Sequence, residues 1–203
     1  MSVTATFLAD RFTSACESVK AAEGELTEID SHFGDADHGV TMVKIAQAIE
    51  DAVKANSGGI KAMLDDSASA VMMINGGSAV PLWNTWLDGM QEAAPDAEEM
   101  ELDDLRKVFA GGLKALSALS KARVGDKTMM DALIPATGAL MADGGTAEEA
   151  LDAAAQAARD GAEATRNFVS KFGRARSYGE QTLGTPDAGA VSMAYFFAGL
   201  AKK

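Results

Sequence analysis

The chain is arranged around one acidic stretch, Asp30-Ser31-His32-Phe33-Gly34-Asp35-Ala36-Asp37-His38-Gly39, which holds three carboxylates and two imidazoles. Its two later aspartates lie two positions apart between glycines. This spacing favours a turn, because helix residues two positions apart point to different sides. A turn lets both carboxylates face one point. We expect a short helix over residues 25–32 to bring Asp30 to the same place.

Three carboxylates that meet at one point repel one another unless a cation neutralises them or their pKa values rise. A divalent cation is the simpler explanation, and an all-oxygen donor set suits Mg²⁺ before Mn²⁺ or Ca²⁺. Mg²⁺ held by a few carboxylates keeps its other positions for water and phosphate oxygens. The sequence therefore predicts that Asp30, Asp35 and Asp37 bind Mg²⁺.

The same stretch has other interpretations. Acidic turns flanked by glycine are also common helix caps. An EF-hand is disfavoured, because the twelfth position counted from Asp30 is Thr41, where that loop needs a bidentate glutamate. A zinc site built on His32 and His38 stays open, although no cluster of Cys or His elsewhere in the sequence supports it.

The composition favours one helical domain. The chain has 203 residues, enough for a sizeable core, and we expect residues 1–203 to form a single domain. Hydrophobic residues make up 47% but aromatic residues only 6%, so the core must be built from Ala, Leu, Val, Ile and 11 Met. That mixture favours close-packed helices, and no stretch alternates with period two for long enough to predict a sheet.

The charge and the cysteine content limit the classes of partner. A formal net charge of −12 argues against nucleic acid and anionic membranes as partners, because both need a basic surface. A nucleotide remains compatible if a metal supplies the positive charge. The single cysteine, Cys16, cannot form an intramolecular disulfide, which fits a reducing cytoplasm. No signal peptide and no apolar run of membrane length is present, so we expect a soluble cytoplasmic protein.

Apolar residues recur at spacings of three and four, which predicts about eight helices besides the short one. They are expected over residues 3–22, 39–56, 60–74, 82–93, 102–122, 125–140, 147–171 and 190–201. Pro135 should kink its helix or mark its early part. In an up-and-down bundle, the polar glycine-containing loops between these helices can gather at one end, where ligand sites are commonly built from loops.

Two of these loops are candidates for binding phosphate, and a third resembles a P-loop only superficially. Gly76-Gly77-Ser78-Ala79 precedes a helix and offers free backbone N–H groups, although it could equally be an ordinary turn. Gly125-Asp126-Lys127-Thr128 lacks the Walker A spacing, and Asp126 could simply cap the next helix. Residues 173–189 form the longest stretch without periodicity, and Arg174 or Arg176 there could supply a planar donor fork for phosphate.

Taken in order, these motifs resemble the ADP-binding L subunit of bacterial dihydroxyacetone kinases, called DhaL, which also occurs as the C-terminal nucleotide domain of single-chain dihydroxyacetone kinases. The resemblance covers essentially the whole chain. It implies an all-α fold, an eight-helix antiparallel up-and-down α-barrel with the nucleotide site at one end. It also implies two Mg²⁺ ions and a bound ADP or ATP.

The resemblance assigns roles to individual residues. Asp30, Asp35 and Asp37 would be the metal ligands. The residues that would line the nucleotide are His38, Gly39, Val40, Thr41, Ser78, Ala79, Met129, Arg174, Asp187, Ala188 and Gly189.

The resemblance also supplies a reaction, which is phosphoryl transfer to dihydroxyacetone or a related small hydroxyketone. In that family the ketone is bound covalently by a histidine on a separate K subunit or domain, DhaK, so we expect the chain to be inactive alone. A DhaM-type phosphohistidine protein is the phosphoryl donor in some members, and exchangeable ATP in others.

The sequence departs from the family pattern in two loops. Val80 and Asn84 stand where glycines are usual, and a β-branched residue adopts positive φ only at a cost. Thr185-Pro186 replaces a usual His-Gln before the Asp187 motif. These changes leave the choice between a triose and a tetrose substrate open. Two other classes also stay open: a non-catalytic nucleotide-binding coregulator of the same fold, and a Zn²⁺-dependent hydrolase that uses His32, His38, Asp35 and Asp37.

Overall fold

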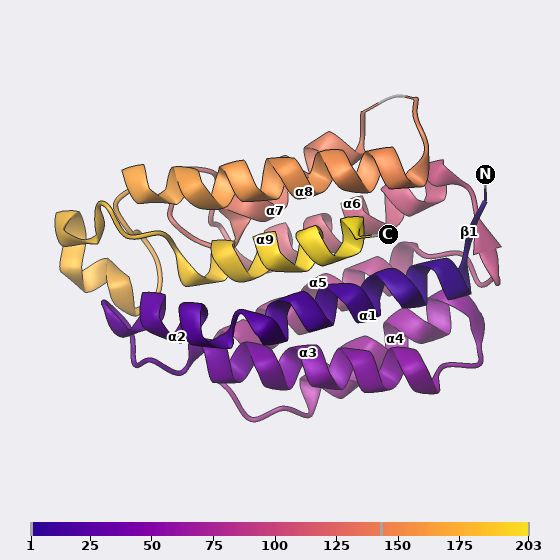
Figure 1. Cartoon of the computed structure of the whole chain (residues 1–203), viewed down its shortest axis with the longest axis horizontal. Helices are drawn as coiled ribbons and strands as arrows, with labels where there is room; N and C mark the ends of the chain where they lie inside the picture. The colour runs from indigo at the N-terminus through magenta and orange to yellow at the C-terminus, as the bar shows by residue number, and fades with distance from the viewer. Residues whose placement is uncertain (1, 143, 203) are drawn as a thin grey trace.

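The computed structural model describes residues 2–142 and 144–202 of the chain. Eight long helices dominate this part (Figure 1). They are α1 (Ala5–Ala21), α3 (His38–Ala55), α4 (Gly59–Met72), α5 (Ala79–Ala93), α6 (Leu102–Leu119), α7 (Met130–Leu140), α8 (Ala147–Ala164) and α9 (Ala188–Ala201). The smaller elements are α2 (Glu23–Ser31), two 3-10 helices, η1 (Thr165–Asn167) and η2 (Arg174–Thr182), and two short strands, β1 (Val3–Thr4) and β2 (Glu99–Met100).

The long helices form a closed ring. Each packs against the next long helix along the chain, and α9 packs against both α8 and α1, which closes the circle. The all-α up-and-down barrel is therefore confirmed. Because successive helices run in opposite directions, α3, α5, α7 and α9 all begin at one end. We call this the acidic end; it carries the acidic stretch and residues 73–78, 120–129 and 165–187.

The few aromatic residues gather in the middle of the ring. Trp86 on α5 makes edge-to-face contacts with Trp83 at 5.4 Å and with Phe196 of α9 at 5.5 Å between ring centroids. Such pairs contribute about 0.5–1.5 kcal/mol beyond the area that they bury. Elsewhere the helices approach closely, as where a Cβ on Gly112 of α6 would lie 2.7 Å from the carbonyl oxygen of Trp86. Small residues and one aromatic cluster thus fill the core that composition predicted.

The structure corrects the expectation that no strand is present. β1 pairs antiparallel with β2, with Val3 opposite Met100, at the end of the ring remote from the acidic end (Figure 1). This pairing makes α1 begin at Ala5 instead of residue 3. Thr4 caps the helix, since its hydroxyl oxygen accepts the N–H of Phe7 at 3.1 Å.

Several helix boundaries also differ from the predicted ones. Helix α5 begins at Ala79, ahead of Pro81, which the first turn of a helix tolerates. Helix α8 ends at Ala164 and gives way to η1, well before residue 171. The stretch predicted to be without regular structure contains η2. In the part of the chain that is described, no helix has both the length and the apolar character needed to cross a membrane.

Candidate functional site

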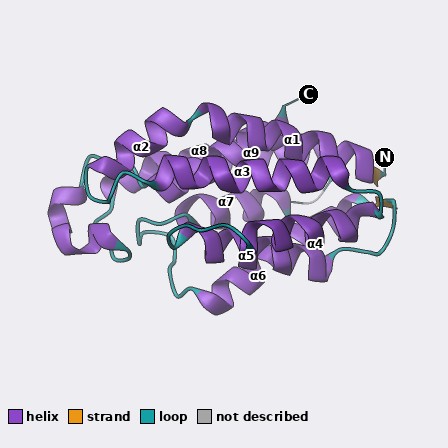
Figure 2. Ribbon diagram, turned by 90° about the horizontal axis from the view of Figure 1, so that it is seen from below, coloured by secondary structure: helices purple, strands orange, loops and turns teal. Residues whose placement is uncertain are grey.

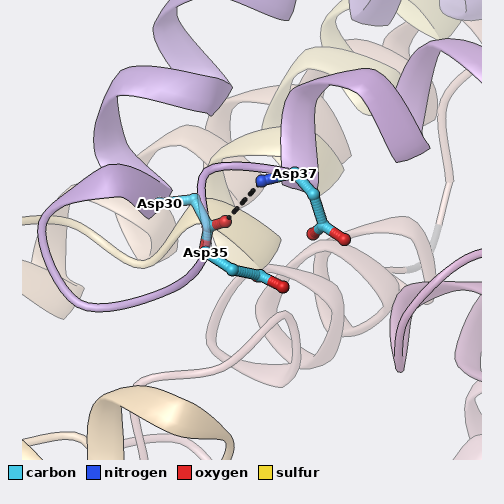
Figure 3. A group of neighbouring side chains, drawn as sticks. All are labelled: Asp30, Asp35 and Asp37. Atoms are coloured by element: carbon cyan, nitrogen blue, oxygen red, sulfur yellow. Dashed lines mark hydrogen bonds between the residues drawn. The ribbon is translucent and has the colours of Figure 1, made fainter.

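The three predicted metal ligands lie together (Figure 3). Asp30 is near the end of α2, and Asp35 and Asp37 belong to the loop that enters α3. Each offers one carboxylate oxygen, and these oxygens lie within 4.8 Å of one another. Asp30 also accepts two backbone N–H groups, from Asp37 at 3.1 Å and from His38 at 3.4 Å. Its carboxylate therefore caps the entry to α3 and faces the other two acids at the same time.

The loop needs its particular residues to hold this shape. A Cβ on Gly34 would lie 2.0 Å from a carboxylate oxygen of Asp30, so only glycine leaves room for that side chain. A Cβ on Gly39 would lie 2.2 Å from the hydroxyl oxygen of Thr27, where α3 crosses α2. Ala36 has a φ of 59°, a left-handed conformation that costs roughly 1–2 kcal/mol for a residue with a Cβ. The backbone thus accepts strain where the carboxylates meet.

The donor set fits Mg²⁺. All three groups are hard oxygen donors, and they are exposed or half-buried, which leaves space for water or phosphate oxygens. Among the described residues, no histidine or cysteine joins them in a cluster of this kind. His38 instead places its Nε2 3.2 Å from Ser192 Oγ, and burial lowers the pKa of its imidazole. His32 lines a separate small cavity of about 250 Å³, so the geometry does not favour the zinc interpretation.

The acidic loop opens onto a cavity of about 660 Å³ at the acidic end. Loops from four parts of the chain line it, and Figure 2 shows several loops at this end, away from the label N. The N-termini of α5 and α9 also border it, at Ala79 and Ala188. A positive dipole end at both places favours a bound anion, and at α9 the N–H of Ala190 already donates to Asp187.

Most residues predicted to line a nucleotide do line this cavity. They are His38, Thr41, Ser78, Ala79, Met129, Arg174, Asp187, Ala188 and Gly189. Gly39 and Val40 are not part of the lining: Gly39 packs against α2, and Val40 is 43% exposed. Direct contact of any of these residues with a ligand stays a prediction.

Arg174 faces the acidic loop across the cavity. Its Nη2 lies 2.7 Å from Asp35 Oδ2, and both side chains are exposed. Arg176, the alternative candidate, is not among the residues that line the cavity. Beside this pair, the rings of Phe33 and Tyr178 meet at 5.2 Å between centroids. Two contacts thus join the acidic loop to η2.

Asp187 begins α9 and borders the cavity. Its Oδ2 accepts the N–H of Ala190 at 2.8 Å, which caps the helix. Surrounding protein atoms raise the pKa of the Asp187 carboxyl to about 7, against the effect of that N–H and of the neighbouring Lys127. The carboxyl is therefore held between its two protonation states near neutral pH.

Sequence reasoning missed two features of the cavity. One is its apolar floor, formed by Leu82, Trp83, Leu116 and Met130, which Leu119 and Phe172 extend to the exposed mouth. The four floor residues belong to ordinary helical stripes, so their periodicity does not distinguish them from core, and Phe172 lies outside the helices. The other is Lys127, which lines the cavity yet is only 3% exposed. Its loop has glycine but lacks the Walker A spacing, and no local pattern predicts that the lysine is buried.

The departures from the family pattern fit the structure without strain. Val80 lies in the first turn of α5 and is not among the residues with positive φ. Asn84 donates its Nδ2–H to the carbonyl oxygen of Ala68 at 2.9 Å, which links α5 to α4. Asp126 does not cap α7, because it pairs with Lys171 at 2.6 Å. Asp131 instead holds the loop before α7, since it accepts the N–H of Thr128 at 2.7 Å, while Thr128 Oγ1 accepts the N–H of Met130 at 3.2 Å.

A closed antiparallel ring of helices with an acidic loop at one end defines a class of protein. The chain belongs to the family of DAK2 domains, whose model matches residues 32–202. It is similar to DhaL, the ADP-binding subunit of the PEP-dependent dihydroxyacetone kinase of Escherichia coli, at 29% identity over 92% of this chain and 91% of that one. A second DhaL subunit, from Listeria innocua, is 31% identical over 82% of this chain and 80% of its own. The resemblance to DhaL is therefore confirmed.

Longer kinases are also similar. D-erythrulose kinase of Mycolicibacterium smegmatis is 34% identical over 94% of this chain, which spans 34% of that protein's length. The native crystal structure of the dihydroxyacetone kinase of C. freundii matches 97% of this chain with a TM-score of 0.75 and 25% identity, and the chain covers 34% of it. The chain thus spans about a third of these relatives. All of them are named as kinases, which confirms the expected family of phosphotransferases.

Proposed function

We propose that the chain, as one DhaL-type domain over residues 1–203, is the nucleotide-binding, phosphoryl-transfer unit of a kinase for a small hydroxyketone. The observation that carries the proposal is the meeting of three carboxylate oxygens within 4.8 Å at the edge of a 660 Å³ cavity. A hard cation between acids and an anion-favouring wall opposite is the arrangement that a bound diphosphate requires. A cytoplasmic location remains part of the proposal and rests on the single cysteine of the sequence.

The residues of the chain would divide the work. Asp30, Asp35 and Asp37 would hold Mg²⁺, which we propose to be two ions, and Mg²⁺ neutralises phosphate charge when it is bound. The N-terminal turn of α5, at Ser78 and Ala79, would donate backbone N–H groups to phosphate oxygens. The apolar floor offers a surface for the flat face of an adenine ring. In this mechanism the chain positions the nucleotide and, through Mg²⁺, neutralises the charge of its phosphates. None of its side chains needs to move a proton.

Arg174 has a second role in this scheme. Its guanidinium pairs with Asp35 in the structure, and a planar fork of donors also suits a phosphate. Because the pair is exposed, we expect it to contribute no more than about 1 kcal/mol to stability. Arg174 is therefore free to exchange the carboxylate for phosphate at little cost.

We propose that a separate substrate-binding partner of the DhaK type covers the acidic end. Of the nine large hydrophobic side chains that are exposed among the described residues, eight lie at this end. They are Val40, Met72, Met73, Leu119, Val124, Phe172, Tyr178 and Leu183. Apolar residues around the mouth of a polar site mark a surface that another protein covers. A phosphohistidine protein of the DhaM type is the proposed donor if ADP stays bound between turnovers.

The substrate is proposed to be dihydroxyacetone or a tetrose such as erythrulose. Relatives of comparable similarity are named for each of these ketoses. Assays of the chain with a DhaK-type protein, and with ATP or a phosphohistidine donor, should therefore include both ketoses. Phosphorylation by the isolated chain would contradict the proposed division between two proteins.

Calorimetric titration with ADP, in the presence and absence of Mg²⁺, tests the site directly. We expect Mg²⁺-dependent binding by the natural chain and its loss in Asp35→Asn. Asp65→Asn is the matched control, because it removes the same charge from an exposed position on the wall of α4. Equal binding by all three proteins would refute the metal site. Tight binding of Mg-ADP without transfer to any ketose would favour a coregulator instead.

A further inference from the structure

Lys127 connects its own loop, which precedes α7, to the segments that end α8 and precede α9. Its Nζ donates to the carbonyl oxygen of Thr165, at the end of α8, at 2.7 Å, and to that of Thr185, before α9, at 2.5 Å. Lys127 itself stands two positions before Met129, and Thr185 stands two positions before Asp187. A single ammonium group therefore links both segments that carry predicted nucleotide contacts.

We propose that Lys127 is a positioning residue, which holds the Met129 loop and the Asp187–Gly189 turn in the register that binds the nucleotide. The inference rests on the proposed function and goes beyond it, because it concerns how the site keeps its shape. Lys127 acts through its neighbours and does not itself have to touch the ligand.

The Met129 loop and the Asp187–Gly189 turn meet at the cavity, so a displacement of either segment would change the site for a ligand. A Cβ on Gly189 would lie 3.4 Å from the backbone nitrogen of Met129, so the turn and the loop lie close together. The N–H of Asp187 donates to Thr165 Oγ1 at 2.9 Å, next to the carbonyl that Lys127 binds. Loss of the ammonium would leave the carbonyl of Thr185 without this donor and that of Thr165 with the N–H of Phe168 alone, and would loosen the turn against the loop.

The position is costly for a lysine, which argues for a specific role. Lys127 is 3% exposed, and its φ of 61° lies in the left-handed region, where glycine is favoured. Thr165 is the C-cap of α8, and a cation there faces the negative end of the helix dipole. An ammonium is the group that can donate to two carbonyls at once and also match this field.

Other residues also hold the loop over residues 125–128. Its anchoring by them can therefore be tested separately from the link that Lys127 makes to Thr165 and Thr185. Asp131 accepts the N–H groups of Gly125 at 2.5 Å and of Thr128 at 2.7 Å. Lys171 pairs with Asp126 at 2.6 Å from the surface, with 60% of its side chain exposed. Lys171 binds the same loop but does not reach the α9 side, which makes it a matched control.

The test measures the affinity for Mg-ADP of the isolated full-length chain and of variants checked for folding by circular dichroism. Lys127→Met removes the ammonium and keeps the length of the side chain. Lys127→Gly also removes it, but relieves the left-handed strain and so supports folding. We expect both to weaken binding by at least about tenfold, as for the loss of hydrogen bonds to a charged group. Lys171→Met should stay within about twofold of the natural chain.

Addition of methylammonium distinguishes positioning from general stability. This small cation fits the space that Lys127→Gly leaves, so it should restore a large part of the affinity, whereas tetramethylammonium, which has no N–H, should not. Affinity of Lys127→Gly within about twofold of the natural chain would overturn the proposal. So would a loss that methylammonium leaves unchanged, or a failure of both variants to fold even with the amine, since each indicates a purely structural lysine. If the natural chain itself fails to bind Mg-ADP, the proposed function falls together with this inference.

Discussion

Substitution of Asp30 separates the two roles that its carboxylate has in the structure. The side chain accepts N–H groups from Asp37 at 3.1 Å and His38 at 3.4 Å, and it also belongs to the group of three acids. Asp30→Asn keeps an oxygen acceptor and removes the charge. Asp30→Ala removes both. The two roles, a cap for α3 alone and a metal ligand, therefore predict different results for these two variants.

The expected stabilities follow from the contacts. A capping oxygen contributes about 1 kcal/mol, and both variants remove the charge, so Asp30→Ala should be less stable than Asp30→Asn by roughly that amount. In Asp30→Asn two charge effects oppose each other. Repulsion from two carboxylates within 4.8 Å is relieved, which is worth about 1 kcal/mol per pair in water. The favourable interaction of the charge with the start of α3, about 0.3–1 kcal/mol, is lost. Asp30→Asn should therefore be as stable as the natural chain or slightly more stable.

The affinity for Mg-ADP should depend on the negative charge at position 30 and not on the stability of the variant. We expect both variants to lose at least about tenfold to a hundredfold in affinity for Mg-ADP, the range found even for groups that only support a metal ligand. Urea denaturation and calorimetry on the same samples give both quantities. Mg²⁺ alone should raise the midpoint for the natural chain but not for Asp30→Asn. Natural affinity in Asp30→Asn, with a loss of stability only in Asp30→Ala, would show that Asp30 is a cap and refute the metal site.

Other predictions concern stability and pH. The pKa of Glu50, which is 4% exposed, is lowered by its hydrogen bonds to Lys20 and Lys54. The stabilisation from these bonds is present above pH 4.5 and is lost as the pH falls through the folded pKa. Glu50→Gln should therefore be less stable than the natural chain by about 1–2 kcal/mol at pH 7 and differ little from it in acid. The pKa of Asp187 is raised from 3.8 to about 7, so its contribution to the free energy of unfolding is full below pH 3.8 and is lost as the pH rises toward 7. Asp187→Asn keeps the cap and should abolish this fall in stability between pH 3.8 and 7, as measured by urea denaturation at several pH values. The same dependence of stability on pH in the variant would contradict the raised pKa. Gly39→Ala would place a methyl 2.2 Å from Thr27 Oγ1, and should cost about 1–3 kcal/mol and weaken Mg-ADP binding; a thermal melt like that of the natural chain would contradict this crowding.

The parts of the fold and site that the sequence predicted depend on neighbours in the chain. The stripes of apolar residues placed the long helices, and two aspartates between glycines placed a turn. Gly34 shows why the prediction succeeds: the residue leaves space for the Asp30 side chain only four positions earlier in the chain. Short-range geometry of this kind can be read directly from spacing.

The features that sequence reasoning missed depend on contacts between distant residues. Helix α8 was predicted to continue to residue 171, but it ends at Ala164, where Thr165 Oγ1 donates to the carbonyl of Ala162 and Lys127 binds the carbonyl of Thr165. Lys127 is 38 positions away in the chain. The apolar floor combines residues of α5, α6 and α7 that each follow an ordinary stripe. No local pattern reports which stripes will border a cavity.

Both ends of the described chain lie away from the acidic end, because α1 begins and α9 finishes at the side where β1 and β2 pair (Figure 1). An 18-residue helix such as α3 is about 27 Å long. A second domain fused before α1 would therefore need a tether of about eight extended residues to reach the mouth along the outside, and one fused after the 14-residue α9 about six. An affinity tag or a surface attachment placed at either terminus should, for the same reason, leave that mouth open to solution.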